Sequence, residues 1–287
     1  MLNQLFQKTY AALSHGVFYR FLSTVMCFLN RTVPVRKDRF VAVGNHRMAG
    51  GSCDRMLAIL LWRWNFLEAY ETALMKSMVR PGMVVLDIGA NIGYYSLIFA
   101  ELVGNTGKVY AFEPDPDNYA MLVGNITKNG YTNIVAIAMA VTRDDGKLSL
   151  YRNPGNRGDH SICGDQRDAG DVAAIEGVAL DSYFVPGSKI DFIKMDIQGA
   201  EMHAFAGMDR LLRENPQIVI LFELKRESAL ILDRDVASFL DSLRRAYRYD
   251  IYVISEKKKA LLPAQDEDII RAWQCGCSIN LLLKRKS

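Results

Sequence analysis

The clearest structural signal in the sequence is the run from Val84 to Leu97, which reads Val-Val-Leu-Asp-Ile-Gly-Ala-Asn-Ile-Gly-Tyr-Tyr-Ser-Leu. Apolar residues lead into Asp87, and two glycines, Gly89 and Gly93, follow before a new apolar pattern begins. An unbroken apolar strand is typical of a parallel sheet covered on both faces. Glycines after such a strand let the chain turn tightly and let a ligand approach bare backbone. The run therefore predicts a strand, a cofactor loop and a helix.

The acid at the end of this strand selects between two classes of cofactor. Nicotinamide and flavin sites use Gly-x-Gly-x-x-Gly, whereas the spacing here is Asp-x-Gly-x-Asn-x-Gly. A carboxylate repels a pyrophosphate but attracts the sulfonium and ammonium groups of S-adenosyl-L-methionine. We therefore predict S-adenosyl-L-methionine as the cofactor, bound by Asp87, Gly89, Asn91 and Gly93.

A second buried strand is predicted from Lys108 to Phe112, and it ends at Glu113. An acid about 20 residues after the glycines is the usual partner of the ribose hydroxyls in dinucleotide-binding folds. We predict that Glu113 binds the ribose of the cofactor.

Four segments together resemble the FkbM family of S-adenosyl-L-methionine-dependent methyltransferases: residues 87–96, 112–114, 193–201 and 216–223. The resemblance covers the chain from Arg80 to Glu223. It implies an α/β fold, the class I methyltransferase fold, in which a Rossmann-like, seven-stranded, mostly parallel sheet has helices on both faces and an antiparallel last strand. Many members carry Glu where this chain has Gln198, so no carboxylate role is assigned at that position.

The resemblance also implies O-methylation, with a sugar hydroxyl of a glycan, a lipopolysaccharide or a glycosylated small molecule as the acceptor. Hydroxyls of polyketides or other secondary metabolites are the alternative acceptors. The non-enzymatic alternative is a cofactor-binding module that anchors a partner and has lost turnover. Base amino-methylation often uses an Asn/Asp-Pro-Pro-aromatic turn after the fourth strand, but the chain reads Asp196-Ile197-Gln198-Gly199 there. A hydroxyl acceptor is therefore expected.

Methyl transfer to a hydroxyl requires alignment of the reacting atoms and removal of a proton. Ligands of open parallel sheets lie beyond the carboxyl ends of the strands, where Asp196 and Glu223 are expected. We predict His160 or Asp196 as the catalytic base and Glu201 and Glu223 as substrate-binding residues. Asp196, Glu201 and Glu223 could alternatively gather Mg²⁺, but their spacing is not diagnostic and no metal is predicted.

The chain of 287 residues, with 50% hydrophobic and 23% charged residues, has the composition of an ordinary globular protein. We expect an N-terminal helical extension over residues 1–79 and a methyltransferase domain over residues 80–287. Ile134 to Val141 reads as a third parallel strand. Arg152 to Glu176 has little periodicity, and long irregular segments are commonly binding loops or lids. We expect this segment to close over the acceptor.

Charge and cysteine content constrain the partners and the compartment. The formal net charge is +3, and the basic residues are scattered apart from 257–259 and 284–286, so nucleic acid is not an expected partner. Residues 2–28 show helical apolar spacing, which predicts packing on the domain or a partner subunit, or a membrane-surface helix. Arg20 and the short apolar run argue against a membrane span. The five cysteines are an odd number in a chain that is large enough to be stable without disulfide bonds. We therefore expect a reducing, cytoplasmic setting.

Overall fold

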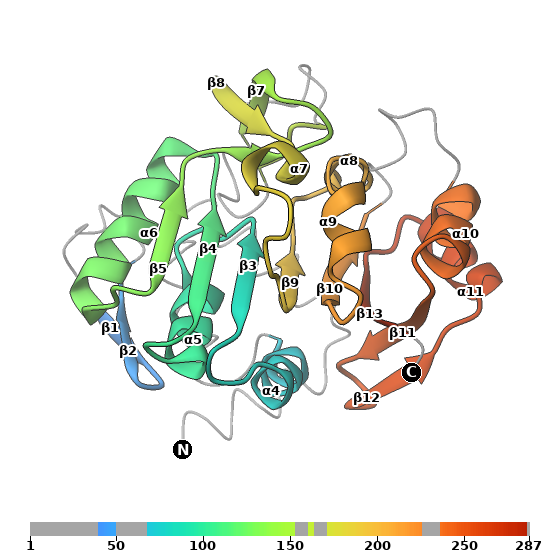
Figure 1. The fold of residues 1–287 in the computed structure, drawn as a ribbon, viewed down its shortest axis with the longest axis horizontal. Helices are drawn as coiled ribbons and strands as arrows, with labels where there is room; N and C mark the ends of the chain where they lie inside the picture. The colour runs from blue at the N-terminus through green and yellow to red at the C-terminus, as the bar shows by residue number, and fades with distance from the viewer. Residues whose placement is uncertain (1–39, 50–67, 153–159, 164–170, 226–235, 286–287) are drawn as a thin grey trace.

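The computed structural model describes residues 40–49, 68–152, 160–163, 171–225 and 236–285 (Figure 1). Its centre is an eight-stranded sheet with the strand order β12-β11-β13-β10-β9-β3-β4-β5. Five neighbouring strands are parallel: β10 (Val219–Leu224), β9 (Phe192–Met195), β3 (Val84–Ile88), β4 (Lys108–Phe112) and β5 (Ile134–Ile137). The other three pair antiparallel: β13 (Ile279–Arg285), β11 (Tyr249–Ser255) and β12 (Ala260–Pro263). The predicted class I methyltransferase fold is confirmed.

The predicted count of seven strands is wrong by one, because β12 adds an eighth strand at the edge of the sheet. This strand pairs with β11, and Ser255 lies opposite Ala260 at the turn. Pro263 ends β12, and proline is tolerated at an edge because no further strand needs its missing N–H. The sequence of Ala260 to Pro263 has no alternation of apolar and polar residues that would predict a strand.

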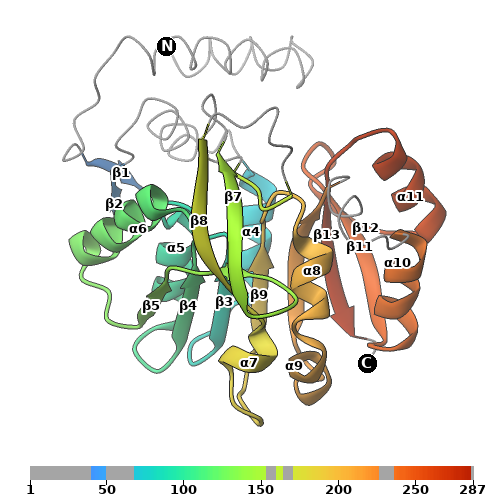
Figure 2. The ribbon, with the colours of Figure 1, turned by 90° about the horizontal axis from the view of Figure 1, so that it is seen from above.

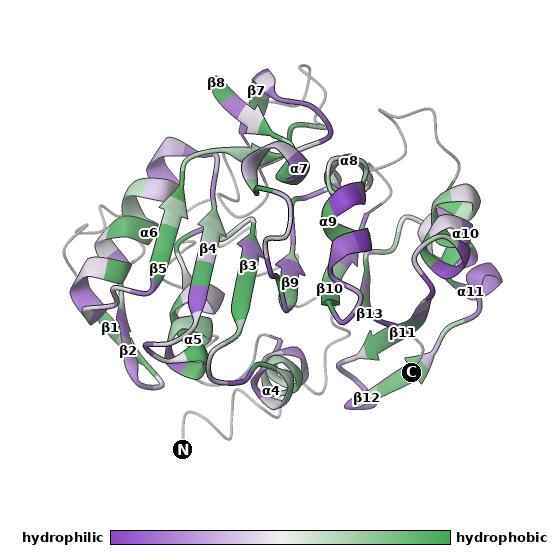
Figure 3. Cartoon of the chain, viewed as in Figure 1, coloured by the Kyte–Doolittle hydropathy of each residue, from purple (hydrophilic) through white to green (hydrophobic). Residues whose placement is uncertain are grey.

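Helices cover both faces of the main sheet, where the described residues form two large apolar clusters, and a third, smaller cluster contains Ala140, Leu150 and Ile175. One cluster includes Met75, Phe99 and Leu122, and the other includes Leu211 and Leu240. In Figure 3 strand β3 is apolar over most of its length, as expected for a strand covered on both sides. The helices contributing to the first cluster are α4 (Ala69–Met78), α5 (Tyr94–Val103) and α6 (Pro116–Asn129), and those contributing to the second are α7 (Leu180–Tyr183), α8 (Glu201–Ala206), α9 (Asp209–Glu214), α10 (Val236–Arg245) and α11 (Asp266–Gln274).

A separate three-stranded sheet lies beyond the carboxyl ends of β3 and β4, as Figures 1 and 2 show. It has the order β6 (Ala140–Val141), β8 (Asp171–Val178), β7 (Gly146–Arg152). The expectation of one strand from Ile134 to Val141 is therefore wrong, because the chain leaves the main sheet after Ile137 and joins the small sheet at Ala140.

The expected irregular segment from Arg152 to Glu176 is also partly wrong. Residues from Asp171 onward form β8, and its residues Asp171 to Gly177 pair with the whole of β7. Residues 153–159 and 164–170 lie outside the described part of the chain. Ser161 makes an isolated bridge to Tyr151, so residues 160–163 are attached to the edge of the small sheet.

The described part of the predicted N-terminal extension contains strands as well as a helix. β1 (Val41–Val43) and β2 (His46–Met48) form a hairpin. The Asn125 amide in α6 holds the end of this hairpin, accepting from Ala49 N at 2.8 Å and donating to Ala49 O at 3.1 Å. The predicted helix in residues 2–28 lies outside the described residues, and the domain boundary at residue 80 stays a prediction. Within the described chain, no helix has the length and apolar character needed to cross a membrane.

Candidate active site

The loop between β3 and α5 is bent by three residues with positive φ. Gly89 has φ 81°, Asn91 has φ 51° and Gly93 has φ 93°. The backbone N–H groups of Gly89 and Ala90 donate to the carbonyl of Phe112 at 3.0 and 2.9 Å. The loop therefore folds against the end of β4, which brings it beside Glu113.

Glu113 joins the two halves of the predicted cofactor site. Its Oε2 accepts from Asn91 N at 2.8 Å, and its Oε1 accepts from Asp115 N at 3.0 Å and Asn118 Nδ2 at 3.4 Å. Burial raises the pKa of Glu113 to about 7, although the N–H groups of Asp115 and Asn91 oppose that shift. Oε2 receives one of these donors, so it retains capacity for a hydroxyl.

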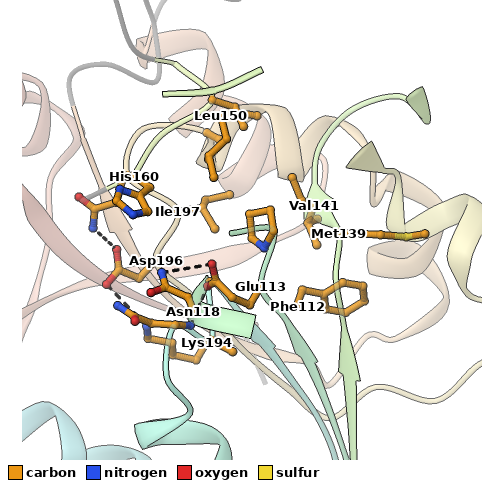
Figure 4. A pocket seen from close by; sticks show the side chains of 18 of the residues that line it. Phe112, Glu113, Asn118, Met139, Val141, Leu150, His160, Lys194, Asp196 and Ile197 are labelled. Carbon is orange, nitrogen blue, oxygen red and sulfur yellow. Dashed lines mark hydrogen bonds and ion pairs between the residues drawn. The ribbon is translucent and has the colours of Figure 1, made fainter. Parts of the chain in front are cut away.

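A pocket opens beside this loop at the carboxyl ends of the strands. Figure 4 shows polar side chains gathered on one side of the pocket, and Phe112, Met139 and Val141 on the other. Five predicted site residues line it: Gly89, Asn91, Glu113, His160 and Asp196. Asp87, Gly93, Glu201 and Glu223 are not among the lining residues.

Asp87 lies beneath the pocket and is fully buried. The Ser96 hydroxyl donates to its Oδ2 at 2.5 Å, and its Oδ1 has no hydrogen-bond partner among the described residues. Burial raises the pKa of Asp87, whereas the neighbouring Lys194 ammonium lowers it. Glycine is favoured at position 93 by its φ of 93°, and a Cβ there would also lie 2.7 Å from Leu122 Cδ1.

Lys194 is a buried ammonium in β9 that also lines the pocket. Its Nζ lies 3.6 Å from Asp196 Oδ2 and 4.9 Å from the centre of the Tyr95 ring. Burial alone would lower the pKa of Lys194, but the carboxylates of Asp196, Asp87, Glu68 and Glu71 together raise it above its usual value. The group is therefore held as an ammonium, which cannot serve as a general base.

Asp196 follows β9, and its carboxylate contacts one amide donor and one ammonium. Gln198 Nε2 donates to its Oδ1 at 2.6 Å, and Lys194 lies on the side of its Oδ2. Figure 4 shows Asp196 between His160 and Lys194 in the polar side of the pocket. The carboxylate thus has a defined orientation next to the space where a ligand can enter.

His160 approaches the pocket from the segment attached to the small sheet. Its Nε2 lies 3.9 Å from Asp115 Oδ2. Asp115 also binds Arg152 Nε at 2.6 Å and caps α6 through N–H groups of Asp117 and Asn118, both at 2.9 Å. Asp115 is the acid that the described structure brings to this histidine.

Glu201 and Glu223, the two predicted substrate-binding acids, lie away from the pocket lining. Glu201 is fully buried, and its Oε1 accepts from Gly199 N at 2.9 Å, which closes the turn after β9. Glu223 lies 3.7 Å from Lys225 Nζ. Burial raises the pKa of Glu223 to about 8, and the Asp196 carboxylate adds to the shift. Among the described residues, no group of three or more His, Cys, Asp or Glu could hold a metal ion.

The chemistry of the pocket fits S-adenosyl-L-methionine. Asn91 Oδ1 in the pocket lining is a buried acceptor that lacks a hydrogen-bond partner among the described residues, as does Asp87 Oδ1 outside the lining, and a cation or hydroxyl would supply the missing partner of such an acceptor. The apolar side formed by Phe112, Met139 and Val141 suits an aromatic base. A glycine loop after one parallel strand and an acid after the next define a class I, S-adenosyl-L-methionine-dependent methyltransferase.

The family model of the methyltransferase FkbM domain matches residues 87–249. The chain therefore belongs to the FkbM methyltransferase family, and the predicted family and cofactor are confirmed.

Two curated relatives and two solved structures are similar to parts of the chain. Hexuronic acid methyltransferase AglP of Haloferax volcanii is 26% identical over 164 residues, which are 56% of this chain and 65% of that protein. Protein-L-isoaspartate O-methyltransferase of Methanococcoides burtonii is 36% identical over 72 residues, 25% of this chain and 33% of that protein. The matched part of the chain thus spans about a third of the length of this isoaspartate methyltransferase.

The first solved structure is the methyltransferase FkbM of Methylobacillus flagellatus, with 17% identity and a TM-score of 0.44 over 79% of this chain and 54% of that one. The second is a SAM-dependent methyltransferase of Aquifex aeolicus, with 15% identity and a TM-score of 0.40 over 75% of this chain and 88% of that one.

Sequence reasoning assigned no role to Lys194, Asp115 or Arg152. A signal was present for Lys194, because it is the one charged residue in the buried strand Phe192–Met195. Asp115 precedes Pro116, a pattern that predicts only a helix cap. Its contact with His160 could therefore not be inferred from the sequence. Arg152 meets Asp115 only because β7 crosses the end of the main sheet.

Proposed function

We propose that the protein transfers a methyl group from S-adenosyl-L-methionine to a hydroxyl oxygen, and that the acceptor is a sugar in a glycan, a lipopolysaccharide or a glycosylated small molecule. The observation that carries this proposal is the pocket, which has Gly89, Asn91 and Glu113 in its lining together with His160 and Asp196. The similarity to a hexuronic acid methyltransferase supports a sugar acceptor.

In this proposal the cofactor is bound by Asp87, Gly89, Asn91, Gly93 and Glu113. Bound S-adenosyl-L-methionine supplies an activated methyl group on a sulfonium. Glu113 accepts hydrogen bonds from the ribose hydroxyls, and the buried charge of Asp87 attracts the cationic end. The glycines let the backbone approach the cofactor closely.

The acceptor side of the proposed reaction requires alignment and removal of one proton. His160 takes this proton if it is the base, and the Asp115 carboxylate, 3.9 Å from Nε2, then stabilises the imidazolium by its charge. Asp196 is the other candidate. If His160 is the base, Asp196 accepts a hydrogen bond from the hydroxyl and orients it, because Gln198 and Lys194 already fix its carboxylate.

A labelling experiment tests the proposed acceptor. Purified protein is incubated with methyl-labelled S-adenosyl-L-methionine and an extract of cells that lack the gene, and the extract is then fractionated. We expect label in a carbohydrate or glycosylated fraction, and none with the Asp87→Ala variant, which should also lose affinity for S-adenosylhomocysteine in calorimetric titration. Label in a polyketide-type fraction would identify a secondary-metabolite hydroxyl as the acceptor in place of a sugar. Label confined to RNA or protein would refute the proposed sugar acceptor, and no label in any fraction would favour a non-enzymatic binding module.

A further inference from the structure

Gln198 lines the pocket, and its side-chain amide links two charged residues. Its Nε2 donates to Asp196 Oδ1 at 2.6 Å. Its Oε1 accepts from Lys225 Nζ, which follows the neighbouring strand β10. A continuous set of contacts therefore runs from Lys194 through Asp196, Gln198 and Lys225 to Glu223.

The two partners of Gln198 require a side chain between them that can both accept and donate a hydrogen bond. An ammonium such as Lys225 has donors alone, and an ionised carboxylate such as Asp196 has acceptors alone. The bridging side chain must therefore accept on one side and donate on the other. An amide does both, whereas an ionised Glu can accept from Lys225 but cannot donate to Asp196.

The backbone at Gln198 is held in a conformation that the side chain does not favour by itself. Gln198 has φ 54°, in the left-handed region, and Gly199 follows with φ 102°. The Ser161 hydroxyl donates to the Gln198 carbonyl at 2.6 Å, and Cys163 Sγ donates to the Gly199 carbonyl at 3.1 Å. Left-handed non-glycine residues cluster at functional sites, where surrounding contacts maintain them. Here those contacts come from the segment that carries His160.

The two ends of the bridge are also fixed. The Lys225 carbonyl accepts from Trp273 Nε1 in α11 at 3.1 Å. Asp196 N donates to the Ile88 carbonyl at 3.0 Å, which attaches this turn to β3. The amide therefore spans two anchored points, and its orientation sets that of the Asp196 carboxylate.

We propose that Gln198 is a positioning residue that holds the Asp196 carboxylate toward the acceptor by bridging it to Lys225. This inference rests on the proposed function, because it assumes that Asp196 meets the acceptor.

A Gln198→Glu variant tests the bridge through its dependence on pH. The protonated form of the introduced carboxyl still donates to Asp196, whereas the ionised form repels Asp196 and retains only Lys225. The titratable and charged groups around the turn are Lys194, Asp196, His160, Glu201, Glu223 and Lys225, and all remain in both proteins, so the ratio of variant to wild type isolates the new group. Gln198→Met removes both hydrogen bonds and adds no titrating group, and Gln217→Glu makes the same charge change at an exposed position.

The measurements are kcat with saturating acceptor and the equilibrium constant of unfolding, each from about pH 4 to 9, a range that includes the ordinary pKa of a Glu carboxyl. For Gln198→Glu we expect the kcat ratio to wild type to fall about tenfold across this range, and the unfolding constant to rise about tenfold, as for loss of one hydrogen bond to a charged group. For Gln198→Met we expect a tenfold lower kcat with no trend in the ratio, and for Gln217→Glu a flat ratio near one.

The inference would be overturned if the Gln198→Glu ratios to wild type, for kcat and for the unfolding constant, did not change with pH, or if Gln198→Met had the kcat of the wild type. Either result would leave the methyltransferase proposal intact. If the wild type transfers no label to any fraction, the proposed function fails instead. The unfolding ratio still decides whether the bridge exists in that case, because it needs no turnover.

Discussion

Gly89 and Asp196 lie against each other so closely that a Cβ on Gly89 would come within 2.0 Å of the Asp196 carbonyl oxygen. The loop after β3 and the turn after β9 are therefore in direct backbone contact. This contact joins the proposed cofactor side of the pocket to the side that holds Asp196. Only glycine permits it, and the φ of 81° at Gly89 is a second reason for glycine there.

Gly89→Ala should therefore push the two segments apart. We expect a loss of about 1–3 kcal/mol in the free energy of unfolding and at least a tenfold weaker affinity for S-adenosylhomocysteine. Denaturant unfolding and calorimetric titration measure the two effects. Gly130→Ala is the matched control, since Gly130 has φ 71° but a Cβ added there would meet no atom within 4 Å. Equal losses in both variants would show that backbone strain alone, and not the Asp196 contact, is responsible.

The affinity for the cofactor should depend on the ionisation of Glu113. Burial raises its pKa to about 7, and ribose hydroxyls bind the carboxylate better than the neutral acid. Affinity for S-adenosylhomocysteine should therefore increase as pH rises from 6 to 8, by up to about tenfold per unit below the pKa. The Glu113→Gln variant should bind more weakly, with no such rise. A wild-type affinity that is constant over this range would contradict the assigned role.

The raised pKa of Glu113 affects folding stability in the opposite direction: affinity for the cofactor should rise with pH, whereas its contribution to stability should fall. A carboxyl whose pKa is higher in the folded protein than in the unfolded chain stabilises the fold at low pH, and that contribution is lost as pH rises through about 7. Unfolding experiments on the wild type and Glu113→Gln between pH 5 and 8 separate this contribution from other groups. The difference in unfolding free energy between the two proteins should change with pH in this window.

Turnover should identify the base. His160→Ala and Asp196→Asn should leave affinity for S-adenosylhomocysteine nearly unchanged, while the variant that lacks the base loses at least about a hundredfold in kcat. An effect confined to the KM of the acceptor would make that residue a positioning group. Wild-type kcat in both variants would mean that neither residue removes the proton and that alignment alone drives the reaction.

Lys194 should stabilise the fold by compensating the buried carboxylates around it. Lys194→Met leaves Asp196, Asp87 and Glu68 without their shared cation, and removal of one partner of a buried pair typically costs about 3–5 kcal/mol. Because carboxylates that lose this cation can take up protons, the loss in unfolding free energy should be larger at pH 8 than at pH 5.5.

Lys189→Met is the matched control for Lys194. Lys189 lies 3.1 Å from Asp191 but is largely exposed, with 73% of its side chain accessible. An exposed pair of this kind contributes about 0–1 kcal/mol. Similar losses for the two variants would contradict the compensating role of the buried ammonium.

The sequence predicted several parts of the fold because they depend on local chemistry. Gly89 and Gly93 have the positive φ that a tight loop requires, and Pro116 and Gly130 mark the two ends of α6 as expected. The buried strands from Val84 and Lys108 were evident because a short, unbroken apolar run is typical of a strand covered on both faces. The proposed cofactor residues follow from the same short run.

Other parts were decided only when distant segments met. The small sheet, the eighth strand β12 and the hairpin at residues 41–48 depend on pairing with partners that local spacing does not specify. Glu201 was predicted to bind the substrate, and that role stays a prediction; the tertiary structure adds that its carboxylate accepts from Gly199 N within its own turn.

The sequence by itself determined the family, the cofactor loop and the two buried strands from Val84 and Lys108, because each depends on the spacing of neighbouring residues. Tertiary structure alone decided which charged and polar groups meet around the pocket: Asp115 with His160, and Gln198 between Asp196 and Lys225. The physical reason is that hydrogen bonds and charge pairing act over a few ångströms. Residues far apart in the chain enter that range only after the sheet has formed.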